Sequence, residues 1–102
     1  MIEIRAEEGT TEFRLILKGH AGYGNKGQDI VCAAVSALTY TLINHLDKVT
    51  GAYRVDQGEP MKIYAYGTGA MAAYRTIMTG YEMIAEKYPD HVRLTEGDLS
   101  IT

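Results

Sequence analysis

Residues 19–48 read GHAGYGNKGQDIVCAAVSALTYTLINHLDK, a glycine-rich segment followed by a long apolar one. In the apolar part, large side chains recur at the three- and four-residue spacing of one helix face, at Val31, Val35, Leu38, Leu42 and Leu46. This period predicts a helix with one buried face. We expect the helix to start with Asp29 as its N-cap, because Asp is among the preferred capping residues, and to end near Lys48.

The segments around this helix predict a sheet and a second helix. Alternating or β-rich runs indicate strands over residues 2–6, 12–18, 52–57, 61–66 and 91–95. Met and Tyr at helical spacing predict a second helix, capped by Thr68 and stopped by Pro89, whose stripe packs in the core or against a second copy. The order β-β-α-β-β-α-β is typical of an α+β fold. We expect one domain over residues 1–102, with a mainly antiparallel sheet and two helices on one face.

The amino-acid composition limits the classes of protein to which this chain can belong. The chain has 102 residues, of which 46% are hydrophobic and 23% charged, and a formal net charge of −3, as in an ordinary globular domain. Its Lys and Arg residues form no cluster in the sequence, which argues against a direct nucleic-acid partner. The single cysteine excludes an internal disulfide framework, and the N-terminus does not resemble a signal peptide. Four polar side chains interrupt the longest apolar stretch, namely Ser36, Thr39, Thr41 and Asn44. We therefore expect that this stretch does not span a membrane and that the protein is cytoplasmic.

Cys32, the only cysteine, is the candidate for chemistry. A thiol reacts as its thiolate, which needs a nearby base or a positive field. His20 can supply the base, and the free N–H groups and dipole of a helix that starts at Asp29 can supply the field. The alternative is that Cys32 is a small buried side chain without reactivity, because free cysteines are often buried.

The segment between His20 and Cys32 is rich in glycine, at Gly22, Gly24 and Gly27. GYGNKG fits the GxGxxG dinucleotide fingerprint, but the acidic residue that should end the next strand is missing, since the nearest candidate, Asp47, falls within the predicted helix. The chain is also short for a doubly wound nucleotide-binding domain. The segment is therefore either a substrate loop, with Tyr23 at its centre, or a plain connection.

The sequence GHA at residues 19–21 and GQDIVCAAVSAL at residues 27–38 together resemble the ribosomal-processing cysteine protease family, Prp. The resemblance covers nearly the whole chain and includes a second helix that ends in Lys-Tyr-Pro. It implies that His20 and Cys32 are the catalytic dyad of a cysteine endopeptidase. It also implies a homodimer that removes a short N-terminal extension from a large-subunit bacterial ribosomal protein, or acts on a phage structural protein. The cut implied by the family lies after a hydrophobic segment ending in Phe and before Ala.

Three residues near this dyad have alternative roles. Asp29 either caps the helix or orients the His20 imidazole as a third catalytic residue. Ser36, one turn beyond Cys32, either hydrogen-bonds near the dyad or bonds back to the helix backbone. The backbone N–H groups of Cys32 and Val31 are the candidate oxyanion hole.

Other residues suggest no further chemistry. His45 and His91 share no metal-ligand spacing with a second residue, so we expect no metal and no cofactor. Tyr23 and the strand bearing Tyr64 and Tyr66 are the candidates for hydrophobic pockets that hold an extended peptide. The competing hypothesis is a non-catalytic, dimeric ribosome-associated or regulatory module in which the cysteine belongs to the core.

Overall fold

The computed structural model describes residues 1–19 and 26–99, with residues 26–29 described by their backbone alone. Over these residues the elements follow the predicted order β-β-α-β-β-α-β. They are β1 (Ile2–Glu8), β2 (Glu12–Lys18), α1 (Lys26–Val49), β3 (Tyr53–Asp56), β4 (Met61–Tyr66), α2 (Thr68–Lys87) and β5 (Val92–Asp98).

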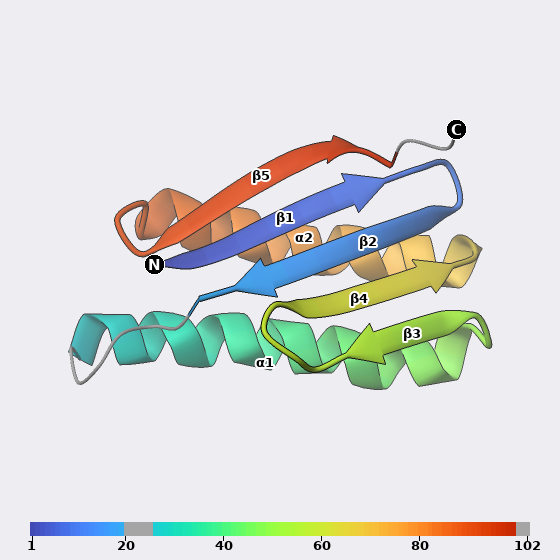
Figure 1. Ribbon diagram of the computed structural model, residues 1–102, viewed down its shortest axis with the longest axis horizontal. Coiled ribbons are helices and arrows are strands. Elements are labelled where there is room, and N and C mark those ends of the chain that lie inside the picture. Colours follow the sequence, from blue (N-terminus) through green and yellow to red (C-terminus); the bar gives the residue numbers. More distant parts are fainter. Residues whose placement is uncertain (20–25, 100–102) are drawn as a thin grey trace.

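The described strands form one sheet in the order β3-β4-β2-β1-β5 (Figure 1). β1 and β2 pair antiparallel as the predicted hairpin, with Glu3 opposite Lys18 and Glu8 opposite Phe13. β4 pairs antiparallel with both β2 and β3, whereas β5 lies parallel to β1. The parallel pair arises because α2 carries the chain back along the sheet between β4 and β5, which therefore run in the same direction. The sheet is mixed and mainly antiparallel.

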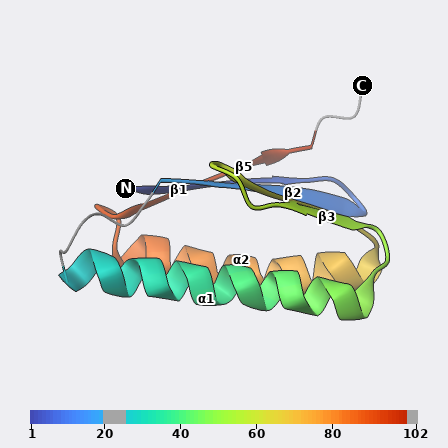
Figure 2. The ribbon, with the colours of Figure 1, turned by 60° about the horizontal axis from the view of Figure 1, so that its bottom comes forward.

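Both helices lie side by side on one face of the sheet (Figure 2), as predicted. Strand residues alternate between the faces, so that Ile4, Leu15 and Ile63 are buried beneath the helices while their neighbours point to the other face. The helices complete the core with the stripes predicted from their periodicity. Their buried apolar residues are Val31, Val35, Leu42 and Leu46 on α1 and Ala70, Met71, Tyr74, Ile77, Met78 and Tyr81 on α2.

The two helices approach each other closely at Gly80. A Cβ atom at this position would lie 2.7 Å from Cδ1 of Leu38. That distance is well below ordinary van der Waals contact, so the approach depends on a residue without a side chain. The Met and Tyr side chains of the α2 stripe are themselves buried in the core, at Met71, Tyr74, Met78 and Tyr81.

A second contact joins α2 to the β1–β2 hairpin. The ring of Tyr74 stacks on that of Phe13, with 4.5 Å between centroids and 18° between planes. The Tyr74 hydroxyl donates to Oε1 of Glu8 at 3.3 Å. Burial raises the pKa of Tyr74 above its ordinary value, with a smaller contribution from Glu8. The phenol therefore remains a neutral donor in the core.

Two predicted helix starts differ from the structure. α1 begins at Lys26, so Asp29 is the fourth helical residue and not the N-cap. Gly27 does not end the helix, because the later residues of α1 bury a strong apolar stripe and this packing outweighs the weak helix propensity of glycine. α2 is preceded by Gly67, with φ 125° and no side-chain cap, so Thr68 is its first residue and not its cap. β5 also extends beyond the predicted end, to Asp98.

Residues 30–49 of α1 are long and apolar enough to cross a membrane by length and composition, with a mean hydropathy of 1.3. The four interrupting polar side chains thus do not by themselves exclude a span, contrary to the sequence-based expectation. The fold supplies a different account of this apolarity. The helix buries one stripe against the sheet and α2, which accounts for the apolar side chains of that stripe.

Candidate active site

Cys32 lies beside the buried stripe of α1, partly exposed and packed against the core. It lines a cavity of about 320 Å³ between α1 and one end of the sheet. The described residues around it are Ile2, Leu17, Val35, Tyr40 and Met61, with Gly19, Ser36, Thr39, Gly58 and Glu59. Its volume falls at the lower end of the range for ligand pockets, about 300–1,000 Å³. The thiol thus borders a cavity while its helix packs on the sheet.

Thr39, which lines this cavity, forms a buried hydroxyl pair with Tyr81. Thr39 Oγ1 lies 2.7 Å from the Val35 carbonyl, to which it donates, and 2.6 Å from the Tyr81 hydroxyl. Because a threonine hydroxyl has one hydrogen, the proton between the two hydroxyls comes from Tyr81. Burial raises the pKa of Tyr81 to about 12, while its hydrogen bond to Thr39 acts in the opposite direction. Both side chains are therefore neutral and fixed at neutral pH.

Gly19 forms the edge of the cavity where β2 ends. Its φ is 91°, in the left-handed region, and a Cβ on it would lie 2.3 Å from the Met1 carbonyl oxygen. Both observations require glycine at this position. His20 is the next residue along the chain, so the close packing of Gly19 against β1 determines where the chain leaves the sheet before the histidine.

Several predicted site residues lie outside the described structure: His20, Gly22, Tyr23 and Gly24. The side chain of Asp29 is also outside it, although its backbone is helical. Gly27 lies in the first turn of α1 rather than in the preceding loop, because the helix starts earlier than its apolar period indicates. The backbone thus removes the capping role of Asp29 and leaves its second predicted role, the orientation of His20, as a hypothesis.

The earlier helix start also changes the expected environment of the thiol. Cys32 is the seventh residue of α1, whereas the field at a helix start falls off within the first turn. Only the first four N–H groups of a helix are free, so those of Val31 and Cys32 belong to its internal hydrogen bonds. The predicted oxyanion hole at these two residues is therefore wrong, and activation of the thiol depends more heavily on a neighbouring base.

Ser36 lies one turn beyond Cys32 and lines the same cavity. Its hydroxyl makes no hydrogen bond to any other described residue, unlike Thr39 and Thr41, which bond back to the helix backbone. The back-bonded alternative for Ser36 is thus not the one found. Its exposed hydroxyl is available to a group that enters the cavity.

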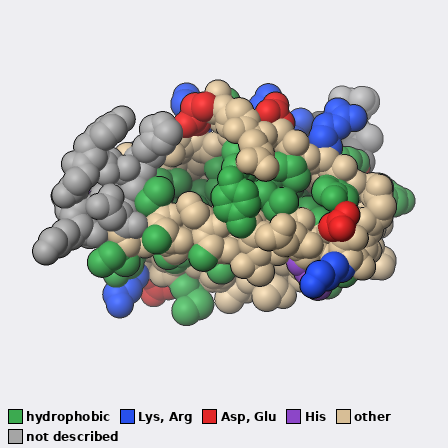
Figure 3. Space-filling model, turned by 90° about the horizontal axis from the view of Figure 1, so that it is seen from below, with side chains coloured by type: hydrophobic (Ala, Val, Ile, Leu, Met, Phe, Trp, Pro, Cys, Tyr) green, Lys and Arg blue, Asp and Glu red, His purple; other side chains and the backbone are tan. Residues whose placement is uncertain are grey.

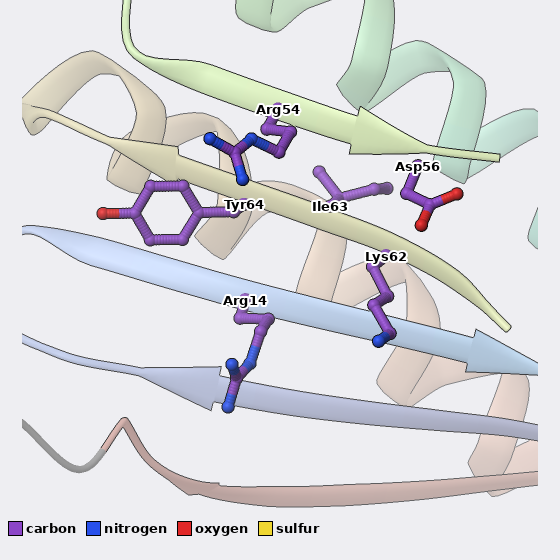
Figure 4. Close-up of a pocket in the computed structure, with 6 residues that line it drawn as sticks. All are labelled: Arg14, Arg54, Asp56, Lys62, Ile63 and Tyr64. Carbon is purple, nitrogen blue, oxygen red and sulfur yellow. The ribbon is translucent and has the colours of Figure 1, made fainter. Parts of the chain in front are cut away.

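A larger hollow, of about 430 Å³, lies on the opposite face of the sheet (Figure 4). It is lined by Arg14, Arg54, Asp56, Lys62, Ile63 and Tyr64. Tyr64 and Tyr66 are 37% and 50% exposed on this face, because strand alternation buries Ile63 and Ala65 instead. These two tyrosines therefore lie away from Cys32, and their role in pockets that hold a peptide stays a prediction. The described residues contain no group of three potential metal ligands.

Sequence reasoning missed Glu59 and Met61, which reach the cavity from the β3–β4 turn and the start of β4. It also missed Thr39, which lines the cavity and hydrogen-bonds to Tyr81. No local signal identifies these residues, because their contact with the Cys32 region depends on how β4 pairs with β2 and how α2 packs against α1.

Comparisons with known proteins identify the class to which this fold and cavity belong. The sequence model of the family "Cysteine protease Prp" matches residues 1–93. The "Ribosomal processing cysteine protease Prp" of Mycoplasma genitalium is 28% identical over 85 residues, which cover 80% of this chain and 86% of the relative. That of Staphylococcus aureus is 30% identical over 87 residues, with coverage of 78% and 82%.

Solved structures show the same fold. SMU.848 from Streptococcus mutans superposes with a TM-score of 0.77 at 24% identity, covering 97% of this chain and 96% of that one. The essential ribosomal processing protease Prp from S. aureus, in complex with a covalently linked product peptide, superposes with a TM-score of 0.75 at 23% identity, covering 94% and 99%. A further S. aureus structure holds a substrate peptide.

A single thiol beside an apolar cavity and the match to this family together define a cysteine protease. The chain belongs to the Prp family of ribosomal-processing cysteine proteases. The non-catalytic module considered from the sequence is not favoured by this membership.

Proposed function

We propose that this protease removes a short N-terminal extension from a large-subunit ribosomal protein, with Cys32 as nucleophile and His20 as base. The observation that carries the proposal is the position of Cys32 in the wall of a largely apolar cavity. Such a cavity suits an apolar side chain of an extended peptide, with the thiol beside the backbone of that peptide. The names of the relatives support the ribosomal substrate.

The reaction follows from the chemistry of the two side chains. The imidazole of His20 takes the thiol proton, and the Cys32 sulfur bonds to the scissile carbonyl carbon. The C–N bond then breaks as the imidazolium returns that proton to the leaving amine, which gives a thioester. His20 next takes a proton from water, whose oxygen displaces the sulfur. The imidazolium returns its proton to the sulfur, so the reaction releases the carboxylic acid and restores the Cys32 thiol.

The test is incubation with the N-terminally extended ribosomal protein, followed by mass measurement of the products. We expect one cut in the wild-type reaction and none with Cys32→Ser or His20→Ala. Arg54→Ala, which changes the opposite face of the sheet, is the matched control and should cut at the wild-type rate. An uncut substrate with the wild-type protein refutes the ribosomal target, and cutting by Cys32→Ser refutes the nucleophile.

A parallel incubation with an extended phage structural protein separates the two substrate classes implied by the family. We propose the ribosomal protein as the target because both relatives are named for that process. Faster cutting of the phage protein would reverse this choice.

Asp29 retains one proposed role, the orientation of His20. Asp29→Asn removes the charge while keeping the size of the side chain. A fall in kcat without loss of thermal stability is the result expected for an orienting carboxylate. Unchanged turnover would leave Asp29 as an ordinary helix residue.

We also propose that the protease acts as a cytoplasmic homodimer. Apolar side chains gather across the middle of the face on which α1 and β3 lie (Figure 3). On α1, Ile30 and Tyr40 are exposed large hydrophobic residues, and an exposed apolar patch is typical of an interface. Sedimentation equilibrium should give twice the monomer mass of 11.3 kDa, and Ile30→Asp should reduce that mass. A monomer at micromolar concentration contradicts the dimer.

A further inference from the structure

The positive charge of this chain gathers on one face of the sheet. Both helices cover the other face (Figure 2), and on the strands the residues of this outer face alternate with the buried ones. The outer face carries six of the ten Lys and Arg residues: Arg5, Arg14, Lys18, Arg54, Lys62 and Arg93. Its strands place four of the thirteen Asp and Glu residues there: Glu3, Glu7, Glu12 and Asp56. The outer face is therefore positive on a chain whose formal net charge is −3.

Two of these carboxylates are engaged with arginines. Glu7 lies 2.6 Å from Nη2 of Arg14 and 3.4 Å from Nη2 of Arg5. Glu3 lies 3.7 Å from Nη1 of Arg93. These two carboxylates thus offset arginines of β1, β2 and β5.

The other two carboxylates accept hydrogen bonds from uncharged groups. Oε2 of Glu12 accepts from the Tyr64 hydroxyl at 2.6 Å, and Oδ1 of Asp56 accepts from the Gly58 N–H at 3.0 Å. Asp56 lies opposite Lys62 in the register of β3 with β4, but no ion pair joins these two described residues. The cations of β3 and β4 are therefore not offset in the way that those of β1 are.

Three cations of the outer face consequently have no carboxylate partner. The side chains of Lys18, Arg54 and Lys62 form no ion pair or hydrogen bond with any other described residue. All three are exposed, and Arg54 and Lys62 line the hollow of about 430 Å³. A guanidinium group and an ammonium group at one hollow favour an anion from another molecule.

Tyr64 adds an aromatic ring to this hollow. In the strand register it lies between Arg14 on β2 and Arg54 on β3. It is 37% exposed, and Figure 4, in which the helices lie behind the sheet, shows the ring with its flat side towards the viewer. The hydrogen bond to Glu12 fixes the hydroxyl end of the ring. An exposed and fixed ring is a surface on which a nucleic-acid base can stack.

The ring and the cations together distinguish between anionic partners. An acidic peptide would pair its carboxylates with the cations and would have no base for the ring. Single-stranded RNA has phosphates for the cations and unpaired bases for the ring. It is therefore the anion that uses both parts of the hollow.

We propose that the outer face of the sheet binds single-stranded RNA, with a base stacked on Tyr64 and neighbouring phosphates held by Arg54 and Lys62. These residues are dispersed in the sequence and come together only through strand pairing, which is why the sequence alone argued against a nucleic-acid partner. The role of this binding in ribosomal processing rests on the proposed function, because ribosomal proteins bind RNA.

The first experiment measures the fluorescence anisotropy of a labelled single-stranded RNA of about 12 nucleotides, a length that one binding domain can cover. We expect a Kd of about 10 µM at about 50 mM salt. A glutamate-rich peptide with the charge of the RNA should displace the labelled RNA at least about tenfold less well than unlabelled RNA does. Equal displacement would assign the face to an acidic protein and refute the RNA site.

Variants of the ring test stacking. Tyr64→Ala should weaken RNA binding about tenfold, because it removes the surface for one base. Tyr64→Phe keeps the ring and should stay within about threefold of wild type. Tyr40→Ala, which removes an exposed tyrosine from α1, is the matched control and should bind as wild type does. Wild-type affinity in Tyr64→Ala contradicts the proposal.

Variants of the cations test the phosphate contacts. The double variant Arg54→Gln/Lys62→Gln should lose at least about tenfold in affinity, and its log Kd should depend less steeply on log salt, by about 0.7 per lost contact. Arg75→Gln/Lys48→Gln is the matched control, because it removes the same two residue types from exposed positions on α2 and α1. Equal losses would show that net charge alone matters and would overturn the site. Thermal unfolding of each variant distinguishes lost binding from lost fold.

Cleavage of a fluorogenic peptide with an apolar segment ending in Phe-Ala separates this inference from the proposed function. Every outer-face variant should cut this peptide at the wild-type rate, because the cavity beside Cys32 lies between α1 and one end of the sheet. A wild-type protein that cuts the extended ribosomal protein and does not bind RNA refutes the RNA site alone. One that binds RNA and leaves that protein uncut refutes the proposed function alone.

Discussion

The hollow on the outer face of the sheet is larger than the cavity beside Cys32, about 430 Å³ against about 320 Å³. Its walls carry the charged side chains of Arg14, Arg54, Asp56 and Lys62. Arg14 donates from Nε to Oε1 of Glu7, on the neighbouring strand, at 2.7 Å, and Glu7 also lies 3.4 Å from Nη2 of Arg5. The smaller cavity combines apolar walls with a thiol and a serine hydroxyl that bonds to no described residue.

The volume of a hollow therefore does not show whether it contains a reactive side chain. The inner cavity holds the single thiol of the chain, whereas three cationic side chains and one carboxylate line the outer hollow. Of these charged groups, Arg14 pairs with Glu7 of the neighbouring strand. Predictions that contrast neighbouring residues of the two regions therefore test this distinction directly.

The largest effect is expected from adjacent residues of β4 that face opposite ways. Met61 lines the inner cavity, and Lys62 lines the outer hollow. Met61→Asp places a charge on the apolar wall and should lower kcat/KM for the peptide about 100-fold, since a charge removed from water costs several kcal/mol. Lys62→Asp should change kcat/KM less than twofold, as expected for a solvated site. Equal losses in the two variants would remove the distinction between the hollows.

The next effect concerns the strand end beside the inner cavity. Gly19→Ala forces a side chain into a left-handed backbone and against the Met1 carbonyl, so the free energy of unfolding should fall by about 2 kcal/mol. Gly51→Ala is the matched control, because a Cβ there has no atom within 4 Å and its φ is not in the left-handed region. Chemical denaturation of the two variants measures the contrast. A Gly19→Ala protein as stable as Gly51→Ala would contradict the close approach.

A smaller effect is expected on the outer face. Glu7 has a side chain only 12% exposed and contacts both Arg5 and Arg14. Glu7→Ala should lower the free energy of unfolding by about 1–2 kcal/mol, because it leaves two guanidinium groups without their carboxylate. Urea titration measures this loss. Peptide cleavage at a temperature where the variant is folded should be unchanged, and a reduced kcat would mean that the outer face contributes to the site.

The smallest effect concerns Tyr81, which hydrogen-bonds to Thr39 behind the wall of the inner cavity. Tyr81→Phe removes one donor to Thr39 and should cost about 0.5–1 kcal/mol at pH 7. Burial raises the pKa of Tyr81 from 10.0 to about 12, so the folded protein holds this proton more tightly than the unfolded chain. That contribution to stability is complete below pH 10 and is lost as pH rises from 10 to about 12. Urea denaturation between pH 9 and 12 should show a steeper loss in wild type than in Tyr81→Phe, and parallel curves would contradict the assignment.

The order of elements and the layer arrangement were predictable because the helical stripes and strand alternation are local patterns with strong periods. The stripe containing Val31 and Leu42 and the alternation at Ile2 and Ile4 each indicate their buried face without knowledge of the partner. The start of α1 was not predictable in the same way. Gly27 and Asp29 resemble a turn and a cap by local preference, and packing later in the helix extends it to Lys26.

The site was predictable only in part. Cys32 was identified because it is the single cysteine and lies beside the apolar stripe. Glu59 and Met61 reach the cavity because β4 pairs with β2, whose residues are far away in the chain. No short-range sequence pattern predicts the register of that pairing. The sequence also suggested no cationic cluster. The alternation of the strands nevertheless brings Arg14, Arg54 and Lys62 around one hollow.

The parallel pairing of β1 with β5 has a consequence for how the chain folds. Ile2 pairs with Val92, so the contact that places β1 inside the sheet joins the first and last strands. Closing so long a loop is entropically costly, and contacts of this kind slow folding. During synthesis β1 would remain an unpaired edge on one side until β5 leaves the ribosome. Ile2 also lines the Cys32 cavity, so the strand that supplies this wall gains its second neighbour only after about 90 further residues have been made.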